Sequence, residues 1–445
     1  MIHLSFFRKL FLSLTLSAFG MLLIACGSSR SFEQELKKEL TETENLNSWF
    51  RGIMIYDPVS KEVLLEHNAH KYFIPASNTK LLTLYTGIKL LKDSVPALKY
   101  ATRNDSLFFK GTGDPSLFYR DFDATNVLLF LKSRPETLVL ISPGKKEKAF
   151  GPGWAWEDYN YAFSAERSEF PLFGNLVTFR KPANSAEIEV IPSFFRSKTS
   201  IDSSSTSGRV SRMQTENSFK IPIFDTSAIE QRVPFITSPQ LSAQLLSESL
   251  GRDVISLKKI PENLSLEKKI YNSPARSLYK IMLQESDNFV AEQLLLLAAG
   301  TIADTLQAQI AIAHMQEMYL QKLPDTVKWV DGSGLSRYNL MTPRSLVKLL
   351  ELISQELPQK ELLALFPAGG VAGTLKNDYH APPNKPAYIY AKTGTLNNNH
   401  SLSGYLITAK GKTLIFSFMN NNFLTSTAMI KAEMEKILRQ YYIHY

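Results

Sequence analysis

The sequence predicts an α/β protein of the α+β type, in which one domain is split by a β-rich insert. Strand-like and helical patterns occur near both ends of the chain, whereas the middle contains short strand-like pieces separated by Gly, Pro and Ser clusters. The 445 residues are enough for two or three domains. A content of 44% apolar and 21% charged residues is that of an ordinary globular protein.

The first residues have the pattern of a signal sequence. Basic residues precede an apolar run from Leu10 to Ala25, which is shorter than the roughly 18 to 20 residues of a membrane-spanning helix. The run ends in Leu23-Ile24-Ala25-Cys26, which resembles the lipobox of bacterial lipoproteins. This predicts a signal peptide over residues 1–25 and lipidation of Cys26. The alternative is an uncleaved anchor with an incidental cysteine.

After a polar tether over residues 26–45, the segment 46–95 is expected to begin the α/β domain. Ile53–Tyr56 and Val63–Leu65 are rich in β-branched and aliphatic residues and flank a turn-like stretch, which is typical of a β-hairpin. Further on, apolar residues recur at helical spacing, which predicts a helix over Lys80–Leu91.

Residues 96–270 are expected to form the β-rich insert, and residues 271–445 to complete the α/β domain. Within the insert, Ser197–Ser218 is rich in Ser and Thr and poor in large apolar residues, which predicts a mobile loop. The later elements that we expect are a helical stretch from Ser273 through Ala299, strands at Leu402–Leu406 and Leu414–Met419, and a C-terminal helix over Thr425–Tyr441.

A candidate nucleophile lies at the start of the first predicted helix. Ser77-Asn78-Thr79-Lys80 matches the pattern S-x-x-K, which places a hydroxyl and an amine on the same helix face. The helix start also offers backbone N–H groups to a developing oxyanion. The pattern alone is weak evidence, because it recurs at Ser142, Ser256, Ser265, Ser277 and Ser345.

Two further short patterns favour an enzyme active site. Ser286-Asp287-Asn288 is the single S-x-N match in the chain, and Lys392-Thr393-Gly394 is the single K-T-G. They follow S-x-x-K in the required order. Three patterns with distinct chemical duties arise together by chance far less often than any one of them.

With these motifs the sequence resembles the penicillin-recognising serine peptidases and β-lactamases, and among them the D-alanyl-D-alanine carboxypeptidases and endopeptidases of the low-molecular-mass class C type. The longer matches are Pro75–Lys80, Gly113–Pro115, Ser286–Asn288 with Ala291–Glu292, Asp331–Arg337 and Ala391–Leu396. That group also carries a large insert between its first and second motifs. The resemblance implies a β-lactamase/transpeptidase-like domain, in which an antiparallel sheet is flanked by helices.

The resemblance implies a role for each motif residue. Ser77 attacks the carbonyl of the penultimate D-alanine of a peptidoglycan stem peptide. Lys80 receives the Ser77 proton, and we expect Lys392 to lower the Lys80 pKa by like-charge repulsion, helped by partial burial. Ser286 relays a proton to the leaving amine, and Asn288 hydrogen-bonds the substrate backbone.

The resemblance also implies that the third motif binds the substrate and stabilises the oxyanion. The resemblance implies that Lys392 and Thr393 bind the terminal carboxylate, and that Gly394 belongs to the same substrate-binding segment. The backbone N–H groups of Ser77 and Thr395 form the oxyanion hole. β-Lactam antibiotics are then expected to acylate Ser77.

Substrate selection rests on residues outside the three motifs. Gly153–Asp158 resembles an insert segment that reaches the active site in this family, and Asp158 is implied to contact the free amine of a diamino-acid side chain. The alternative is an exposed carboxylate in a turn. Arg337 is implied to help hold the substrate, whereas Asn397 takes a pocket position where the family can carry a different amide.

Other functional classes fit the sequence less well. The net charge of +8 could favour anionic surfaces, but no nucleic-acid-binding motif is present. His67 and His70 have the spacing of metal ligands, yet no third ligand is evident, so neither a metal nor a cofactor is expected. A β-lactamase or esterase of the same fold and a non-catalytic penicillin-binding sensor remain as alternatives.

The expected location is the cell envelope, on a membrane facing the periplasm through the Cys26 lipid. Gly27, in place of an acidic residue, suggests by family analogy the outer membrane of a Gram-negative bacterium. The balance between removal of a terminal D-alanine and cleavage of cross-links stays open, because both use the same D-alanyl carbonyl chemistry.

Overall fold

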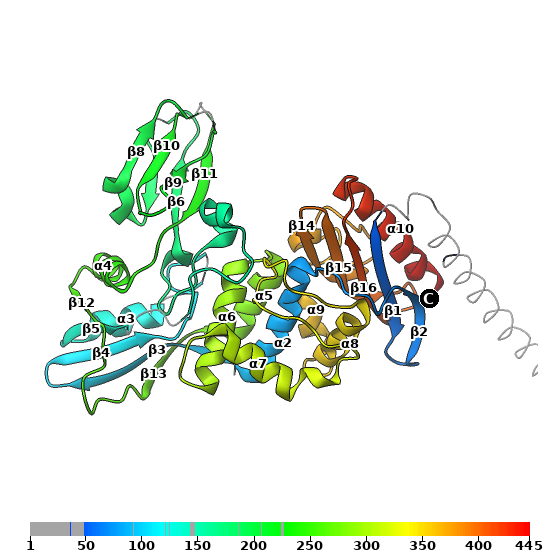
Figure 1. Ribbon diagram of the computed structural model, residues 1–445, viewed down its shortest axis with the longest axis horizontal. Helices are drawn as coiled ribbons and strands as arrows, with labels where there is room; N and C mark the ends of the chain where they lie inside the picture. Colours follow the sequence, from blue (N-terminus) through cyan, green and yellow to red (C-terminus); the bar gives the residue numbers. More distant parts are fainter. Residues whose placement is uncertain are drawn as a thin grey trace, which may run out of the picture.

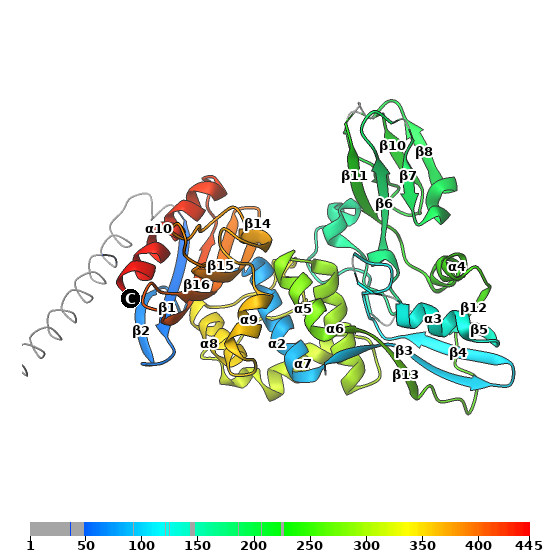
Figure 2. The same ribbon diagram turned by 180° about the vertical axis from the view of Figure 1, so that it is seen from behind.

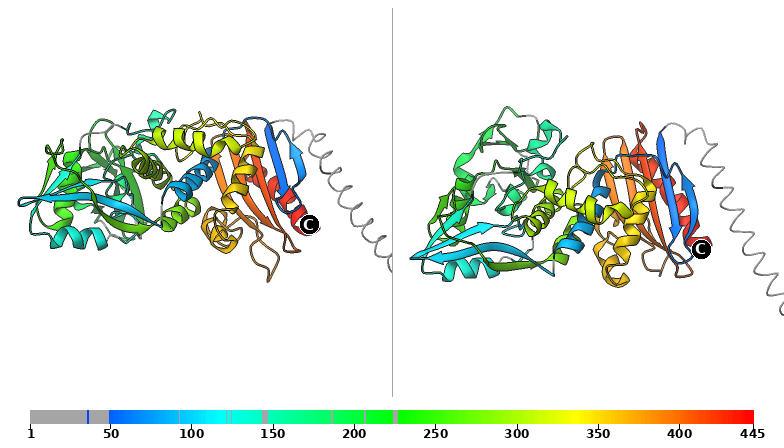
Figure 3. Two further views of the ribbon diagram at one scale, coloured as in Figure 1. Left: turned by 90° about the horizontal axis from the view of Figure 1, so that it is seen from below. Right: turned by 60° about the horizontal axis from the view of Figure 1, so that its bottom comes forward.

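The computed structural model describes Leu36 and residues 49–445, except residues 92, 121, 124, 143–146, 186, 206 and 224–226. The predicted signal peptide, the lipidated Cys26 and, apart from Leu36, the predicted tether lie outside the described residues. Figures 1 and 2 show an elongated molecule with a sheet at one end, a layer of helices beside it, and the insert at the other end. The views in Figure 3 show the same succession along the long axis.

The end sheet is antiparallel throughout and has the strand order β14-β15-β16-β1-β2. Its strands are β1 (Phe50–Asp57), β2 (Glu62–His67), β14 (Ile389–Leu396), β15 (Asn399–Ile407) and β16 (Thr413–Asn421). The predicted hairpin and the two predicted C-terminal strands are confirmed. Because β1 pairs with β16, the beginning and the end of the described chain close one sheet.

Alternation along the strands gives the sheet two buried faces. In β16, Phe416 and Phe418 pack with helix α10 (Thr427–His444), whereas Ile415 and Met419 belong to the core beneath the other helices. The predicted C-terminal helix and the antiparallel sheet with helices on its faces are both confirmed.

The helical layer lies between this sheet and the insert (Figure 1). Its members are α2 (Lys80–Leu90), α5 (Ala275–Gln284), α6 (Asn288–Ile302), α7 (Ala308–Met318), α8 (Pro343–Ser354) and α9 (Gln359–Leu365). Short 3-10 turns complete the domain at η2 (Ala76–Thr79), η7 (Leu320–Lys322) and η8 (Gly373–Leu375). Helix α6 is buried continuously from Phe289 to Ala299, which agrees with its apolar residues on every face.

The predicted helical stretch from Ser273 through Ala299 is wrong in one respect, because the chain breaks between α5 and α6. Ser286 has φ +54, and Asp287 caps α6 by accepting a hydrogen bond from the Val290 N–H. The left-handed backbone and the cap turn the chain at the second motif. Apolar periodicity alone does not reveal this break.

The insert contains one five-stranded mixed sheet with the order β12-β5-β4-β3-β13. Its elements are β3 (Ser94–Arg103), β4 (Ser106–Gly111), α3 (Thr125–Ser133), β5 (Thr137–Ile141), α4 (Pro239–Leu250), β12 (Val254–Leu257) and β13 (Lys268–Pro274). Helix α4 begins at the Ser238 cap with Pro239 in its first turn, and Gly251 ends it at φ +68. A separate apolar core fills this part of the chain.

Two small three-stranded sheets form the upper lobe of the insert (Figure 1). Their strands are β6 (Leu176–Lys181), β7 (Glu189–Ile191), β8 (Thr199–Asp202), β9 (Ser211–Arg212), β10 (Phe219–Pro222) and β11 (Ile229–Pro234). The remaining 3-10 turns of the insert are η3 (Trp156–Asn160), η4 (Ala162–Ser164), η5 (Phe173–Asn175) and η6 (Ser193–Lys198).

The prediction that Ser197–Ser218 is one loop is therefore wrong. Strands β8 and β9 lie in this stretch and both pair with β10, which buries Phe219 in the insert core. The polar residues occupy short edge strands, where pairing of the main chain does not require an apolar run. None of the helices in the described part of the chain is long and apolar enough to span a bilayer.

Candidate active site

Ser77 lies at the centre of a tight turn where the helical layer meets β14. It belongs to the 3-10 turn η2, and α2 begins at Lys80, so the serine precedes the α-helix rather than occupying its first turn. Ala76 has φ +48, a left-handed conformation that is costly for a residue other than glycine. The half-buried Ser77 side chain lines a cavity of about 280 Å³.

The Lys80 amine contacts Ser77 and ties the first motif to the second. Its Nζ lies 3.0 Å from Ser77 Oγ, 2.6 Å from Asn288 Oδ1 and 2.7 Å from the Ser333 carbonyl oxygen. The Lys80 side chain is fully buried. Three acceptors around one amine fix its direction, and one of them is the candidate nucleophile.

Burial lowers the pKa of Lys80 to about 8. Desolvation is the main cause, and three carboxylates, those of Asp331, Asp287 and Glu292, oppose it. The expectation that repulsion by Lys392 would be the main cause is wrong. Burial and, next, the nearby Lys80 amine hold the pKa of Lys392 well below its usual range.

The second motif presents Ser286 and Asn288 from the break before α6. Asp287 between them is held from the insert, because its Oδ2 accepts hydrogen bonds from the Tyr119 hydroxyl at 2.7 Å and from Arg120 Nε at 2.9 Å. Asn288 Nδ2 donates to the Phe163 carbonyl oxygen at 3.0 Å. The Asn288 amide thus joins Lys80 to the 156–164 segment of the insert.

The third motif lies on the edge strand β14 and faces Ser286. Lys392 Nζ donates to Ser286 Oγ at 3.0 Å and to the Thr393 carbonyl oxygen at 2.8 Å. The Thr393 hydroxyl lies 2.9 Å from the Thr374 hydroxyl. The cavity is lined by Ser77, Ser286, Thr374, Thr393, Thr395, His400 and Lys431.

Gly394 explains how β14 comes so close to the nucleophile. A Cβ at this position would lie 2.5 Å from the Pro75 carbonyl oxygen and 3.1 Å from the Ser77 nitrogen. Any side chain would therefore push the strand away from the turn. The structure places Gly394 against the turn that holds Ser77, and Gly394 is not among the residues that line the cavity.

The two predicted substrate contacts outside the motifs have different surroundings. Asp158 lies in η3 and is partly buried; burial and, next, Glu157 raise its pKa. Arg337 is exposed and donates to the Asn397 carbonyl oxygen at 3.4 Å. Neither Asp158 nor Arg337 is among the residues that line the cavity. Asp158 therefore belongs to a segment that contacts the second motif, whereas Arg337 contacts the turn between β14 and β15.

Sequence reasoning missed several charged and polar residues around the site. His400 is a buried residue of β15, with Nδ1 2.9 Å from Thr395 Oγ1. Lys431 of α10 reaches the cavity and donates to Asp378 Oδ2 at 2.7 Å. Glu292 and Asp331 belong to segments that resemble the family in sequence. The spacing of the residues did not indicate that their carboxylates act on the Lys80 amine.

Two larger cavities elsewhere in the described part of the chain contain none of the motif residues. One of about 630 Å³ lies between the end of α6 and the insert sheet. Among the described residues, no group of three or more His, Cys, Asp or Glu side chains could hold a metal ion.

A hydroxyl in contact with a buried amine, beside a second amine and hydroxyl pair, is the arrangement of a serine hydrolase with a lysine base. The chain belongs to the D-Ala-D-Ala carboxypeptidase 3 (S13) family, whose model matches residues 32–222 and 236–441. The family resemblance in the motifs is thereby confirmed.

Individual relatives agree with the family. The chain is 23% identical to the D-alanyl-D-alanine carboxypeptidase DacB of Haemophilus influenzae, over 91% of each chain. It is 24% identical to a D-alanyl-D-alanine carboxypeptidase of an Actinomadura species, over 87% of this chain and 81% of that one.

Solved structures show the same fold. The crystal structure of penicillin binding protein 4 from Haemophilus influenzae superposes with a TM-score of 0.71 and 20% identity, covering 89% of this chain and 97% of that one. A second structure of that protein, in complex with a β-lactam, covers 92% and 99% with a TM-score of 0.68 and 20% identity.

Proposed function

We propose that this enzyme hydrolyses the D-alanyl-D-alanine bond of peptidoglycan stem peptides through an acyl-enzyme on Ser77. The observation that carries the proposal is the 3.0 Å contact between Ser77 Oγ and the buried Lys80 amine. Membership of the D-Ala-D-Ala carboxypeptidase family supplies the reaction class. Each motif residue then has its own role in the reaction.

Acylation begins with neutral Lys80. Its amine takes the Ser77 proton while Oγ attacks the carbonyl carbon of the penultimate D-alanine. The negative charge that forms on the carbonyl oxygen accepts hydrogen bonds from the backbone N–H groups of Ser77 and Thr395. As the C–N bond breaks, Ser286 passes its proton to the nitrogen of the leaving D-alanine and takes one from the Lys392 ammonium, which donates to Ser286 Oγ. Water later hydrolyses the ester and returns a proton to Ser77.

Lys392 and Thr393 recognise the terminal carboxylate in this proposal. The Lys392 amine is already within hydrogen-bond distance of Ser286, and the Thr393 hydroxyl lies at the cavity wall. A bound substrate carboxylate places a negative charge beside the Lys392 amine and favours its protonated form. Protonated Lys392 in turn favours neutral Lys80, because both amines are buried in the same site. Binding of the correct substrate end thereby prepares the base.

Asp158 reads the side-chain amine of the third stem-peptide residue. Its segment reaches the second motif through the Asn288–Phe163 hydrogen bond. The Asp158 carboxylate has no ion-pair partner at 4.0 Å or less among the described residues, so it is available to a substrate ammonium. Arg337 has a weaker case, because only its 3.4 Å approach to Asn397 brings it near the third motif.

β-Lactams are expected to acylate Ser77, since a relative of the same fold is solved with a β-lactam bound. Labelled penicillin separates this proposal from the alternatives on the same fold. A long-lived adduct is the result for a peptidase. Rapid turnover would indicate a β-lactamase, and no adduct would indicate a non-catalytic protein.

The balance of substrates is tested with defined muropeptides. Purified enzyme is incubated with monomers that end in D-Ala-D-Ala and with cross-linked dimers, and the products are weighed by mass spectrometry. Loss of one alanine from the monomer supports the proposed carboxypeptidase. Conversion of dimers to monomers would add endopeptidase activity, and no reaction with either would refute the proposal.

The proposed location is a periplasm-facing membrane, with Cys26 as the lipid attachment site. The support is the apolar run that ends in Leu23-Ile24-Ala25-Cys26. An enzyme tethered in this way acts on peptidoglycan within reach of its anchor. The analogy of Gly27 favours the outer membrane.

A further inference from the structure

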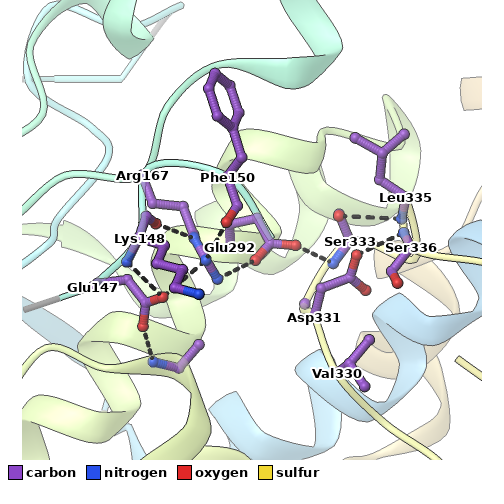
Figure 4. A network of polar contacts seen from close by, with 12 residues as sticks. Glu147, Lys148, Phe150, Arg167, Glu292, Val330, Asp331, Ser333, Leu335 and Ser336 are labelled. Atoms are coloured by element: carbon purple, nitrogen blue, oxygen red, sulfur yellow. Dashed lines mark hydrogen bonds and ion pairs between the residues drawn. The ribbon is translucent and has the colours of Figure 1, made fainter. Parts of the chain in front are cut away.

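A chain of buried polar groups runs from the insert to the catalytic lysine. The Ser333 main chain lies between Lys80 and Glu292: its carbonyl accepts from Lys80 Nζ at 2.7 Å, and its N–H donates to Glu292 Oε1 at 2.7 Å. Figure 4 shows Glu292 directed at the Ser333 nitrogen. Glu292 thus fixes the peptide on which the lysine rests, without contacting the cavity itself.

The other carboxylate oxygen of Glu292 faces Arg167 of the insert. Arg167 Nη1 lies 3.4 Å from Glu292 Oε2, and Nη2 lies 2.8 Å from Glu147 Oε1. Its remaining N–H groups donate to the carbonyl oxygens of Lys148 at 3.2 Å and Phe150 at 3.0 Å (Figure 4). Both Arg167 and Glu292 are buried, with 2% and 1% of their side chains exposed, so solvent does not screen this pair.

The loop that carries Ser333 is also tied to the turn that holds Ser77. Asp331 accepts from the N–H groups of Gly334 and Ser336 and from Trp154 Nε1. Gly334 has φ +80 and packs so closely on the Ser77 turn that a Cβ there would lie 1.9 Å from the Ala76 carbonyl oxygen. A displacement of Ser333 is therefore transmitted to Lys80 and to the nucleophile turn.

We propose that Glu292 is a positioning residue for the reaction, which holds Lys80 on Ser77 through the Ser333 main chain and is itself held by Arg167 of the insert. The proposal rests on the proposed function of the same site. It gives the insert a part in catalysis besides substrate selection. The length of the Glu292 side chain is what matters in this proposal, because the position of its carboxylate oxygen fixes the Ser333 N–H.

Two conservative variants separate the effect of the length of the Glu292 side chain from the effect of its charge. Glu292→Gln keeps the length and an acceptor oxygen but removes the charge, whereas Glu292→Asp keeps the charge and withdraws the oxygen by one methylene. The measurement is the acylation of each protein by labelled penicillin. The amplitude reports the folded, competent fraction, and the first-order rate constant reports the alignment of Lys80 and Ser77.

The expected rate constants are within about fivefold of wild type for Glu292→Gln and at least about tenfold lower for Glu292→Asp, since a misplacement of about 1 Å costs up to about 10²-fold. Glu351→Asp is the matched control, because this buried glutamate of α8 bonds only Tyr56, Lys61 and Lys348 through its carboxylate in the described structure. It should change stability but not the rate constant.

Either of two results would overturn the inference: equal rate constants for wild type and Glu292→Asp, or a Glu292→Gln rate constant as low as that of Glu292→Asp. A merely structural role would lower amplitudes and leave the rate constants unchanged. Wild-type protein and Ser77→Ala run in parallel. A wild-type protein without an adduct would refute the proposed function, whereas a normal wild-type adduct with the wrong variant order refutes this inference alone.

Discussion

Lys80 is the residue whose chemistry depends most on its surroundings. With a pKa of about 8, about one Lys80 amine in ten is neutral at pH 7, against a far smaller fraction for an ordinary lysine. The neutral form is the base in the proposed mechanism. The acylation rate should therefore rise with pH, pass its half-maximum near pH 8 and level off above it.

The measurement for Lys80 is the rate constant of penicillin acylation between about pH 6 and pH 9.5. Lys80→Arg keeps the charge but cannot lose its proton at these pH values, so it should lose the titration and about 10²- to 10⁴-fold in rate. A wild-type profile that stays flat across this range would show that another group is the base.

Asp158 is expected to set a preference for substrates with a free amine at the third position. A charge-assisted hydrogen bond of about 1.5–3 kcal/mol corresponds to about ten- to a hundredfold in selectivity. Asp158→Asn should erase most of the preference for free over acetylated peptides and leave penicillin acylation nearly unchanged. The kcat/KM ratio for the two peptides measures this, and an unchanged ratio in the variant would exclude the role.

At the residue scale, the sequence predicted the members of the site but not the balance of charges among them. The three motifs named Ser77, Lys80 and Lys392, which the fold brings together. The carboxylates of Asp331 and Glu292 come from distant segments and act on Lys80 only after folding. Local patterns therefore could not reveal that burial, rather than Lys392, lowers the Lys80 pKa.

At the scale of elements, strand β14 and turn η2 depend on each other through Gly394. Gly394→Ala would place a Cβ against the Pro75 carbonyl oxygen and the Ser77 nitrogen. The strand must then move away from the nucleophile, and the Thr395 N–H moves with it. Acylation should slow by about 10²-fold, as for the loss of one oxyanion donor or a shift of about 1 Å.

Gly411→Ala is the control for this change. A Cβ at Gly411 meets open space, but φ is +82, so the substitution strains the backbone without touching the site. It should lower the melting temperature and leave the acylation rate constant at the wild-type value. If Gly394→Ala also acylates at the wild-type rate, the close approach of β14 to the turn is not needed for catalysis.

The elements that sequence reasoning predicted well are those whose apolar pattern is strong. The β1–β2 hairpin, helix α2 and helix α10 follow their patterns closely. The break at Ser286 and the strands within Ser197–Ser218 were missed. Both depend on partners far away in the sequence: Tyr119 and Arg120 hold the Asp287 cap, and β10 supplies the pairing for β8 and β9.

At the scale of the whole molecule, several side-chain hydrogen bonds join the insert to the candidate site, among them those of Asn288 with Phe163 and of Asp331 with Trp154. Tyr119 and Arg120 hold the second motif through Asp287, and Arg167 holds Glu292. Sequence composition indicated an inserted region but did not indicate which of its residues contact the motifs. The contacts are visible only in the folded structure, as side-chain hydrogen bonds between the insert and the catalytic domain.

The predicted lipid anchor concerns the whole molecule because it decides where the enzyme meets its substrate. Wild-type protein should fractionate with membranes and incorporate labelled fatty acid, whereas Cys26→Ser should do neither while keeping its penicillin-binding activity. Equal recovery of the two proteins in the soluble periplasmic fraction would contradict the anchor.

The central claim is that Ser77 forms an acyl-enzyme with a peptide that ends in D-Ala-D-Ala. The most direct test mixes wild-type and Ser77→Ala proteins with such a peptide, measures released D-alanine, and maps the acid-quenched adduct by mass spectrometry. We expect wild type to release D-alanine and to carry the acyl group on Ser77, and Ser77→Ala to lose up to roughly 10⁶-fold in rate. An adduct on another residue, or D-alanine release by Ser77→Ala at the wild-type rate, would contradict the account.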